Sequence, residues 1–312
     1  MPEGGGVLAP ALGPAREEAL PVTDRPVPPI GANTWIWVSP LTDAPLADIA
    51  PRVAGWGFDV IELPIEDPGD WDPSRTARLL ADLGLGATVC AVMPPGRELV
   101  ATEPDVVART QDYLRRCVDA AAQVGSGVVA GPMYASVGRT WRPAPGERTA
   151  WAEQLTAALA PVADHAASSG VRLAVEPLNR YETSVVNTVE QGLAVIADLP
   201  AAAVGLTLDI YHLNIEEQDP PAAVRAAGAA GRLAHVQVCA NDRGAPGADH
   251  VDWMALRDAL DDAGYGGPLC IESFTADNAS IATAASIWRP LARSQDAIAT
   301  DGLAFLRRVW AT

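Results

Sequence analysis

The chain has 312 residues, of which 49% are apolar, and a formal net charge of −17. This size allows one large core or two ordinary domains, and the negative charge opposes contact with phosphate backbones, which disfavours nucleic-acid binding. The sequence contains no lysine, so Schiff-base chemistry and a lysine-anchored pyridoxal phosphate are excluded. No apolar run approaches the length of a membrane span, and we therefore expect a soluble protein without membrane contact.

The cysteines and the first residues of the chain indicate its compartment. The four cysteines are Cys90, Cys117, Cys239 and Cys270. They show no CxxC spacing and lie mostly in apolar runs, which predicts reduced core residues of a cytoplasmic protein. Residues 1–29 are rich in Gly, Ala, Pro and Glu and lack the parts of a signal peptide. We expect a disordered leader there, before one domain at residues 30–312.

From Gly31 onward, short apolar runs alternate with longer segments of helical periodicity. The apolar runs predict strands at Asn33–Val38, Asp59–Ile65, Ala87–Met93, Gly127–Met133, Arg172–Leu178, Gly205–Tyr211, Leu233–Cys239 and Pro268–Phe274. The periodic segments predict helices at Pro45–Gly55, Pro73–Leu83, Val106–Val124, Glu147–Ser169, Val189–Leu199, Pro221–Ala230, Trp253–Ala263 and from about Ala297 to Trp310. This alternation is typical of parallel βα units, and it predicts a single α/β domain, a closed (β/α)8 TIM barrel.

Each of the last four predicted strands carries, at or near its end, a polar side chain that can bind a metal ion. These residues are Glu176, Asp209, Gln237 and Glu272. In an α/β barrel, the carboxyl ends of the strands face the active site. Three converging carboxylates repel one another unless a cation lies between them, and oxygen donors favour Mg²⁺ or Mn²⁺ over zinc. Each residue alone also has a structural interpretation, as a helix N-cap, a buried hydrogen-bond partner or a member of a salt bridge.

Further candidates lie near these strand ends. Trp35 and Trp37 alternate with Ile36 on the first predicted strand, so one of them is expected to form an apolar wall of a pocket or to pack inside the barrel. His235 lies two residues before Gln237 and on the same side of its strand. It either orients a ligand, contacts a substrate or packs as a hydrogen-bonded interior residue.

Several motifs in the second half of the chain are more specific. They are EPLNRYE at 176–182, LDIYHLNIEE at 208–217, HVQ at 235–237 with NDR at 241–243, VDW at 251–253, and GYGGP at 264–268 with ESF at 272–274. They resemble the D-tagatose 3-epimerase and D-allulose (psicose) 3-epimerase family of xylose isomerase-like TIM barrels, and the resemblance runs from about Gly31 to Trp310. It implies metal ligands at Glu176, Asp209, Gln237 and Glu272, an acid/base pair of Glu176 and Glu272, and substrate contacts at Glu182, His212 and Arg243.

One of the implied ligands departs from this family. Gln237 stands where the epimerases have a histidine. Its His-x-Gln pattern is similar to that of hydroxypyruvate isomerase and of inosose-processing relatives in the same superfamily, in which the glutamine is a ligand. A glutamine can still bind the metal ion at this position, so the metal site remains expected. The change leaves open whether the enzyme acts at C3 of the sugar.

The resemblance implies a ketose 3-epimerase that acts on free sugars. One glutamate would remove the proton beside a carbonyl that a divalent ion polarises, and the other would return a proton to the cis-enediolate from the opposite face. The ion is expected to be Mn²⁺, with Mg²⁺ or Co²⁺ as alternatives. The same ligands also fit a ketose–aldose or hydroxypyruvate-type isomerase, an inosose dehydratase or a C-glycoside deglycosidase. An inactive barrel that serves as a binding subunit stays open as well.

The expected partner is a small-molecule sugar. Because epimerase relatives pair through helices at the ends of the barrel, the resemblance also implies a homodimer or a homotetramer. A hetero-assembly stays open.

Overall fold

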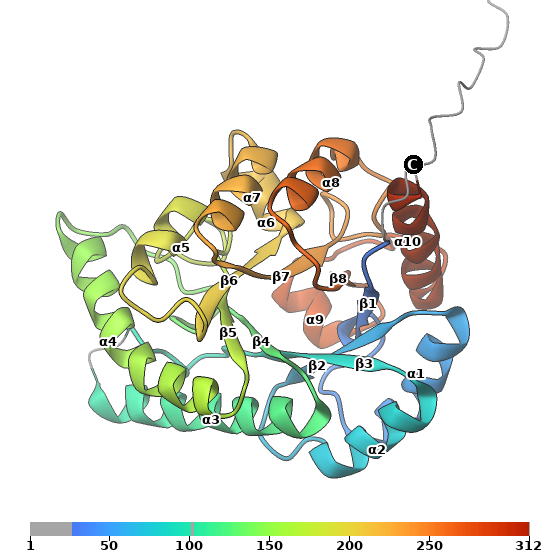
Figure 1. Ribbon diagram of the computed structural model, residues 1–312, viewed down its shortest axis with the longest axis horizontal. Helices are drawn as coiled ribbons and strands as arrows, with labels where there is room; N and C mark the ends of the chain where they lie inside the picture. The colour runs from blue at the N-terminus through green and yellow to red at the C-terminus, as the bar shows by residue number, and fades with distance from the viewer. Residues whose placement is uncertain (1–26, 101–102, 312) are drawn as a thin grey trace, which may run out of the picture.

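The chain folds around one closed barrel of parallel strands. The computed structural model describes residues 27–100 and 103–311. Within them β1 pairs with both β2 and β8, so the sheet has no free edge. Helices surround the barrel (Figure 1), and the predicted single TIM barrel is confirmed. The strands are β1 (Ile30–Asn33), β2 (Val60–Ile65), β3 (Gly86–Ala91), β4 (Val128–Gly131), β5 (Arg172–Val175), β6 (Val204–Asp209), β7 (Leu233–Val238) and β8 (Leu269–Ile271).

The helices begin and end where the sequence supplies capping residues. The side chains of Asp72 and Thr188 accept backbone N–H groups in the first turns of their helices. Gly57, Gly84 and Gly125 end three helices with φ angles of 91°, 67° and 74°, which residues with a Cβ rarely adopt. The helices are α1 (Asp43–Trp56), α2 (Pro73–Leu83), α3 (Pro104–Val124), α4 (Glu147–Ser168), α5 (Val189–Val195), α6 (Ile210–Glu216), α7 (Pro220–Ala229), α8 (Trp253–Asp262), α9 (Ala279–Ala284) and α10 (Gln295–Trp310).

The first strand differs from the prediction. A strand from Asn33 to Val38 is wrong, because β1 ends at Asn33 and Thr34–Ile36 form a 3-10 turn. The side chain of Asn33 accepts the backbone N–H of Trp35 at 2.9 Å and so caps this turn. Aromatic and β-branched residues are typical of strands, but here a local hydrogen bond decides the conformation. Trp35 and Trp37 therefore do not alternate across a strand.

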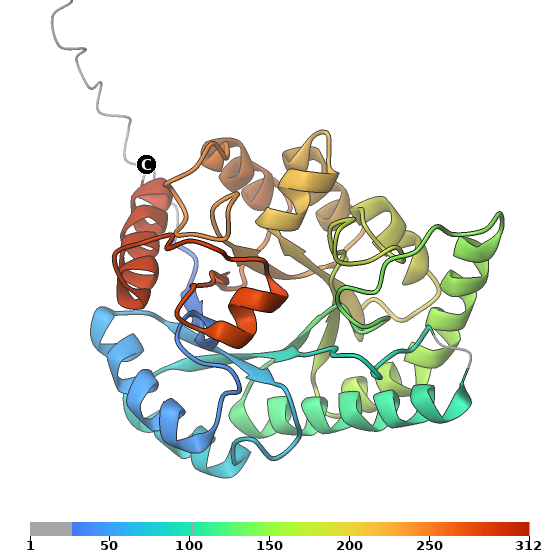
Figure 2. The ribbon, with the colours of Figure 1, turned by 180° about the vertical axis from the view of Figure 1, so that it is seen from behind.

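Two short helices lie where the sequence analysis predicts none. Helix α6 has 7 residues and α9 has 6, so neither is long enough to show an apolar periodicity. Figure 2 shows α9 in front of the barrel, over the end at which the strands finish. Both helices follow strands directly or closely, and both contribute residues to the site described below.

Most of the predicted leader cannot be compared with the structure. Its residues 1–26 lie outside the described residues, and residues 27–29 lead directly into β1. No helix in the described part of the chain combines the length and the apolar character of a membrane span.

Part of the barrel interior is polar. The strand register pairs Asn33 with Glu62 and Glu62 with Thr88, and it pairs Asp209 with Gln237. All five residues are buried. Since buried polar groups are stable only with hydrogen-bond partners, these residues have to form a connected network, and they lie close to the strand ends where barrels place their function.

Candidate active site

The four predicted metal ligands lie together at the carboxyl ends of neighbouring strands. Glu176 directly follows β5, Asp209 ends β6, Gln237 lies in β7 and Glu272 directly follows β8. Each of them has at most 6% of its surface exposed. Glu176, Gln237 and Glu272 also line a cavity of about 860 Å³. The fold thus brings these side chains together beside a cavity that is large enough for a sugar.

Arg243 lies among these carboxylates. Its Nη1 donates to Asp209 Oδ2 and also to Glu272 Oε2, the latter at 3.2 Å. The guanidinium carbon is 4.1 Å from the ring centre of Tyr211 and 4.8 Å from that of Phe274. Burial lowers the pKa of Arg243, but the carboxylates outweigh burial and raise this pKa well above its usual value. The arginine therefore stays charged and balances part of the negative charge of the site.

The two predicted acid/base residues hold protons more tightly than ordinary carboxyl groups. Burial raises the pKa of Glu176 well above its usual value, and Asp209 raises it further against the opposing charge of Arg243. Burial likewise raises the pKa of Glu272, where Arg243 opposes the shift and the other carboxylates add to it. The arginine alone does not compensate the carboxylates. The site is therefore short of positive charge, which a divalent cation would supply.

His212 and Glu182 line the same cavity. Nδ1 of His212 accepts the backbone N–H of Asn179 at 3.0 Å, and Asn179 also donates from Nδ2 to Glu182 Oε1 at 2.8 Å. Burial, aided by the charge of Arg243, lowers the pKa of His212. Nε2 of His212 lies 3.0 Å from Nη2 of Arg243, a group that can only donate. Nε2 is 3.6 Å from Glu176 Oε1 and therefore faces the site.

The fold separates the other predicted substrate contacts. Trp35 lines the cavity and packs against Phe274, with ring centres 6.2 Å apart. Trp37 instead stacks on Trp56 of α1, at a centre distance of 5.9 Å, and does not line this cavity. His235 is fully buried inside the barrel and does not line it either. Of the two tryptophans it is thus Trp35 that lies at the cavity, while Trp37 packs against a helix and His235 belongs to the hydrogen-bonded interior network.

Glu62 of β2 is a residue of this site that the sequence analysis misses. Its carboxylate accepts hydrogen bonds from His235 Nε2 at 2.6 Å, Gln237 Nε2 at 3.0 Å, Thr88 Oγ1 at 3.0 Å and Asn33 Nδ2 at 3.1 Å. Burial raises its pKa, but the charge of His235 and the hydrogen bonds of His235, Gln237 and Thr88 outweigh burial and lower the pKa to about 2. A signal was present, since a glutamate inside the apolar run VIELPI is seldom buried without partners.

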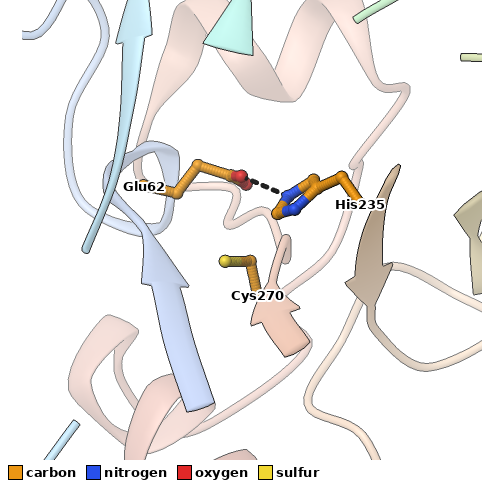
Figure 3. Close-up of side chains that lie close together, drawn as sticks. All are labelled: Glu62, His235 and Cys270. Atoms are coloured by element: carbon orange, nitrogen blue, oxygen red, sulfur yellow. Dashed lines mark hydrogen bonds and ion pairs between the residues drawn. The ribbon is translucent and has the colours of Figure 1, made fainter. Parts of the chain in front are cut away.

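Glu62, His235 and Cys270 form a group of possible ligand atoms within 4.8 Å of one another (Figure 3). Glu62 Oε2 and His235 Nε2 are 2.6 Å apart, which is a hydrogen-bond distance, whereas two such ligands on a tetrahedral zinc ion would be about 3.3 Å apart. Burial raises the pKa of the Cys270 thiol well above its usual value, so this thiol is neutral and a poor ligand. The group is therefore a hydrogen-bonded glutamate–histidine pair beside a thiol.

Comparison with known proteins identifies the class of this protein. The xylose isomerase-like TIM barrel family matches residues 51–309, which is most of the barrel. The chain therefore belongs to the xylose isomerase-like TIM barrel family.

Several relatives that the chain resembles over most of its length are 3-epimerases. L-Ribulose 3-epimerase of Mesorhizobium japonicum is 34% identical over 279 residues, which cover 89% of this chain and 92% of the relative. Ketose 3-epimerase of Arthrobacter globiformis is 30% identical over 280 residues, 89% of this chain and 95% of the relative. The crystal structure of D-allulose 3-epimerase from Methylomonas sp. in complex with D-allulose has a TM-score of 0.83 at 30% identity, covering 91% of this chain and 98% of that one. The predicted resemblance to 3-epimerases and the predicted enzyme class, an isomerase, are confirmed.

Proposed function

We propose that the chain is a metal-dependent ketose 3-epimerase that acts on free sugars. The observation that carries this proposal is the convergence of Glu176, Asp209, Gln237 and Glu272, three of which line a cavity, in a chain 34% identical to an L-ribulose 3-epimerase. Two carboxyl groups with raised pKa values beside a cavity are suited to remove and return protons. A ketose suits such a pair, because its carbonyl makes a neighbouring C–H bond acidic, and ketoses are the substrates named for the relatives.

The residues of the site fit a divalent ion. Gln237 Oε1 is buried and has no hydrogen-bond partner among the described residues. Glu176, Asp209 and His212 place possible ligand atoms within 4.8 Å of one another. We propose Glu176, Asp209, Gln237 and Glu272 as the ligands and Mn²⁺ as the ion, with Mg²⁺ or Co²⁺ as alternatives, because oxygen donors favour hard ions. When bound, the ion supplies Lewis-acid polarisation of the substrate carbonyl.

Glu176 and Glu272 are the proposed proton-transferring pair. They follow β5 and β8, which lie three strands apart around the barrel, so they approach a substrate between them from different sides. One carboxylate removes the proton from C3, and the resulting cis-enediolate receives a proton on its opposite face from the other, protonated glutamate. The configuration at C3 is thereby inverted, which one glutamate acting alone would not achieve.

His212, Glu182 and Arg243 are proposed to bind the oxygens near the carbonyl. Nε2 of His212 faces the site and can form a hydrogen bond with a sugar hydroxyl group, while Glu182 can accept a hydrogen bond from another hydroxyl group. Arg243 can donate to an oxygen beside them. Trp35 supplies an apolar wall for the remainder of the sugar. Contacts of this kind hold C3 between the two glutamates, which lowers the entropic part of the barrier.

The test follows deuterium from D₂O into a panel of ketoses that includes L-ribulose and D-allulose. The protein is stripped of metal with EDTA and reloaded with Mn²⁺, and the products are analysed by NMR. We expect deuterium at C3 together with the 3-epimer, only after reloading. Glu176→Gln and Glu272→Gln should each lower the rate by about 10²- to 10⁴-fold, whereas the exposed Glu190→Gln serves as the matched control.

Other positions of exchange would identify other reactions. Deuterium at C1 with an aldose product would mean a ketose–aldose isomerase, and loss of a hydroxyl group would mean a dehydratase. Cleavage of a carbon–carbon bond in a 3-keto glycoside would mean a deglycosidase. Bound Mn²⁺ without exchange in any sugar would contradict the proposal and favour a binding subunit.

We also expect a homodimer or a homotetramer in the cytoplasm. Tyr181 and Trp288 are 75% and 73% exposed, and aromatic side chains are enriched at protein interfaces. Light scattering of the purified chain measures the mass directly. A monomer at micromolar concentration would contradict this expectation.

A further inference from the structure

The side-chain amide of Gln237 ends in an oxygen and a nitrogen of almost the same size. The oxygen accepts hydrogen bonds, whereas the nitrogen donates them. Nε2 of Gln237 donates to Glu62 Oε1 at 3.0 Å and to Glu272 Oε1 at 2.7 Å, while its Oε1 has no partner among the described residues. A metal ion can bind only the oxygen end, because the amide nitrogen has no free lone pair. Which end faces the ion therefore decides whether Gln237 is a ligand at all.

The two carboxylates beside Gln237 fix this choice. If the amide turned by 180°, its oxygen would face Glu62 and Glu272 and both hydrogen bonds would become repulsive contacts. Glu272 is itself a proposed ligand, and its oxygens would be drawn to the ion. Glu62 is then the partner that remains to hold the amide nitrogen.

Glu62 is in turn held firmly in place. It accepts His235 Nε2 at 2.6 Å, Thr88 Oγ1 at 3.0 Å and Asn33 Nδ2 at 3.1 Å, and its side chain is fully buried. It does not line the described cavity, so it is placed to contact the amide of Gln237 and not the sugar. A carboxylate that accepts this many hydrogen bonds has little freedom to rotate. Glu62 can therefore hold the neighbouring amide of Gln237 in one orientation.

We infer that Glu62 is a positioning residue that holds the side-chain amide of Gln237 with its oxygen toward the metal ion. The role of His235 follows from this, since it anchors Glu62 inside the barrel. This inference rests on the proposed function, because it presupposes that Gln237 is a metal ligand.

The test measures Mn²⁺ affinity by the loss of the free-ion electron paramagnetic resonance signal during titration, without any substrate. Glu62→Gln keeps the size of the side chain but accepts either end of the Gln237 amide. Glu62→Asp keeps the charge but withdraws the carboxylate by about 1.5 Å. We expect both variants to bind Mn²⁺ about 10- to 100-fold more weakly than the wild type, because groups that orient a ligand commonly contribute this much.

Two controls separate orientation from general electrostatics. Glu66→Gln removes a negative charge at the same cavity without touching Gln237, and it should change the affinity by less than about threefold. In a Gln237→Ala background, Glu62→Gln should cause no further loss, because the residue through which it acts is gone. Unfolding curves of the metal-free variants show whether each one is folded.

The outcomes distinguish this inference from the proposed function. The inference would be overturned if both Glu62 variants bound Mn²⁺ as tightly as the wild type. It would also be overturned if Glu62→Gln weakened Mn²⁺ binding as much in the Gln237→Ala background as in the wild type. In either case the proposed function stands if Mn²⁺ binding by the wild type depends on Gln237. A wild type that binds no Mn²⁺ would overturn the proposed function, and the inference with it.

Discussion

At the scale of single residues, Arg243 dominates the charge balance of the site. Its guanidinium contacts Asp209 and Glu272 and packs against the rings of two aromatic residues. Its backbone has a φ angle of 69°, which is uncommon for a residue with a Cβ, so the surrounding structure holds it there. The same charge that is proposed to bind a sugar oxygen thus also stabilises the fold while no metal is bound.

Replacing Arg243 should therefore destabilise the metal-free protein more than the metal-bound protein. Arg243→Leu leaves buried carboxylates without their cation, and breaking such a pair costs about 3 to 5 kcal/mol. We expect this loss in the free energy of unfolding by urea with EDTA present, and a clearly smaller loss with Mn²⁺, because the ion compensates the same carboxylates. The exposed pair of Arg225 and Asp262 provides the control, since Arg225→Leu should cost less than about 1 kcal/mol under both conditions. Equal losses with and without metal would contradict this assignment.

At the scale of elements, the 3-10 turn after β1 decides what the two tryptophans do. Asn33 ends the strand by accepting the N–H of Trp35, and the turn directs Trp35 to the cavity. Trp37 then packs against Trp56, and its Nε1 donates to Asp296 of α10 at 2.8 Å. Neighbouring tryptophans of one short segment therefore have separate tasks, one at the substrate cavity and one in helix packing.

The two tryptophan variants should accordingly have different effects. Trp35→Ala removes an apolar wall of the cavity, and we expect KM to rise about tenfold, which corresponds to about 1.4 kcal/mol of lost binding. Trp37→Ala should lower the free energy of unfolding by about 2 kcal/mol or more, with KM close to that of the wild type. Steady-state kinetics and urea unfolding of both variants measure this. This division of roles would be contradicted if Trp37→Ala raised KM. It would also be contradicted if Trp35→Ala were stable and had the KM of the wild type.

The elements also show how far the sequence was informative. The alternation of apolar runs and periodic segments, with glycines at helix ends, predicted the barrel, because each signal is local. Glu176, Asp209 and Glu272 could be found for the same reason, since each stands at or beside the end of a strand. The network around Glu62 could not be assembled, because its partners His235 and Gln237 are 173 and 175 residues away. Whether Asn33 continues a strand or caps a turn depends on one hydrogen bond, which composition does not reveal.

At the scale of the whole molecule, buried carboxyl groups make stability depend on pH in opposite directions. Glu62 has a pKa lowered to about 2, so the stability it contributes is present above its usual pKa of 4.5 and is lost as the pH falls toward 2. Glu176 and Glu272 have raised pKa values, so the stability that they contribute is present below 4.5 and is lost as the pH rises through their values in the folded protein. The metal-free protein should therefore be most stable on the acid side of neutrality.

Thermal unfolding across the pH range tests this dependence. With EDTA, we expect the midpoint to fall as the pH rises above 4.5, by an amount that reflects about 1.4 kcal/mol for each unit of pKa shift. With Mn²⁺, the fall should largely disappear, because the ion favours the ionised carboxylates. The double variant Glu176→Gln, Glu272→Gln should show little fall even without metal. A midpoint for the metal-free wild type that rises over this range would contradict the assignment of these groups.

The pairing of β1 with β8 has a consequence for how the chain is made. Asn33 and Glu272, which meet at the site, are 239 residues apart in the sequence. A ribosome therefore has to synthesise almost the entire chain before the barrel can close, and until then β1 and β7 both present open strand edges. The acidic residues of the last strand ends also arrive late, so the proposed metal site is complete only after the sheet is. We therefore expect the ion to bind the finished protein rather than the nascent chain.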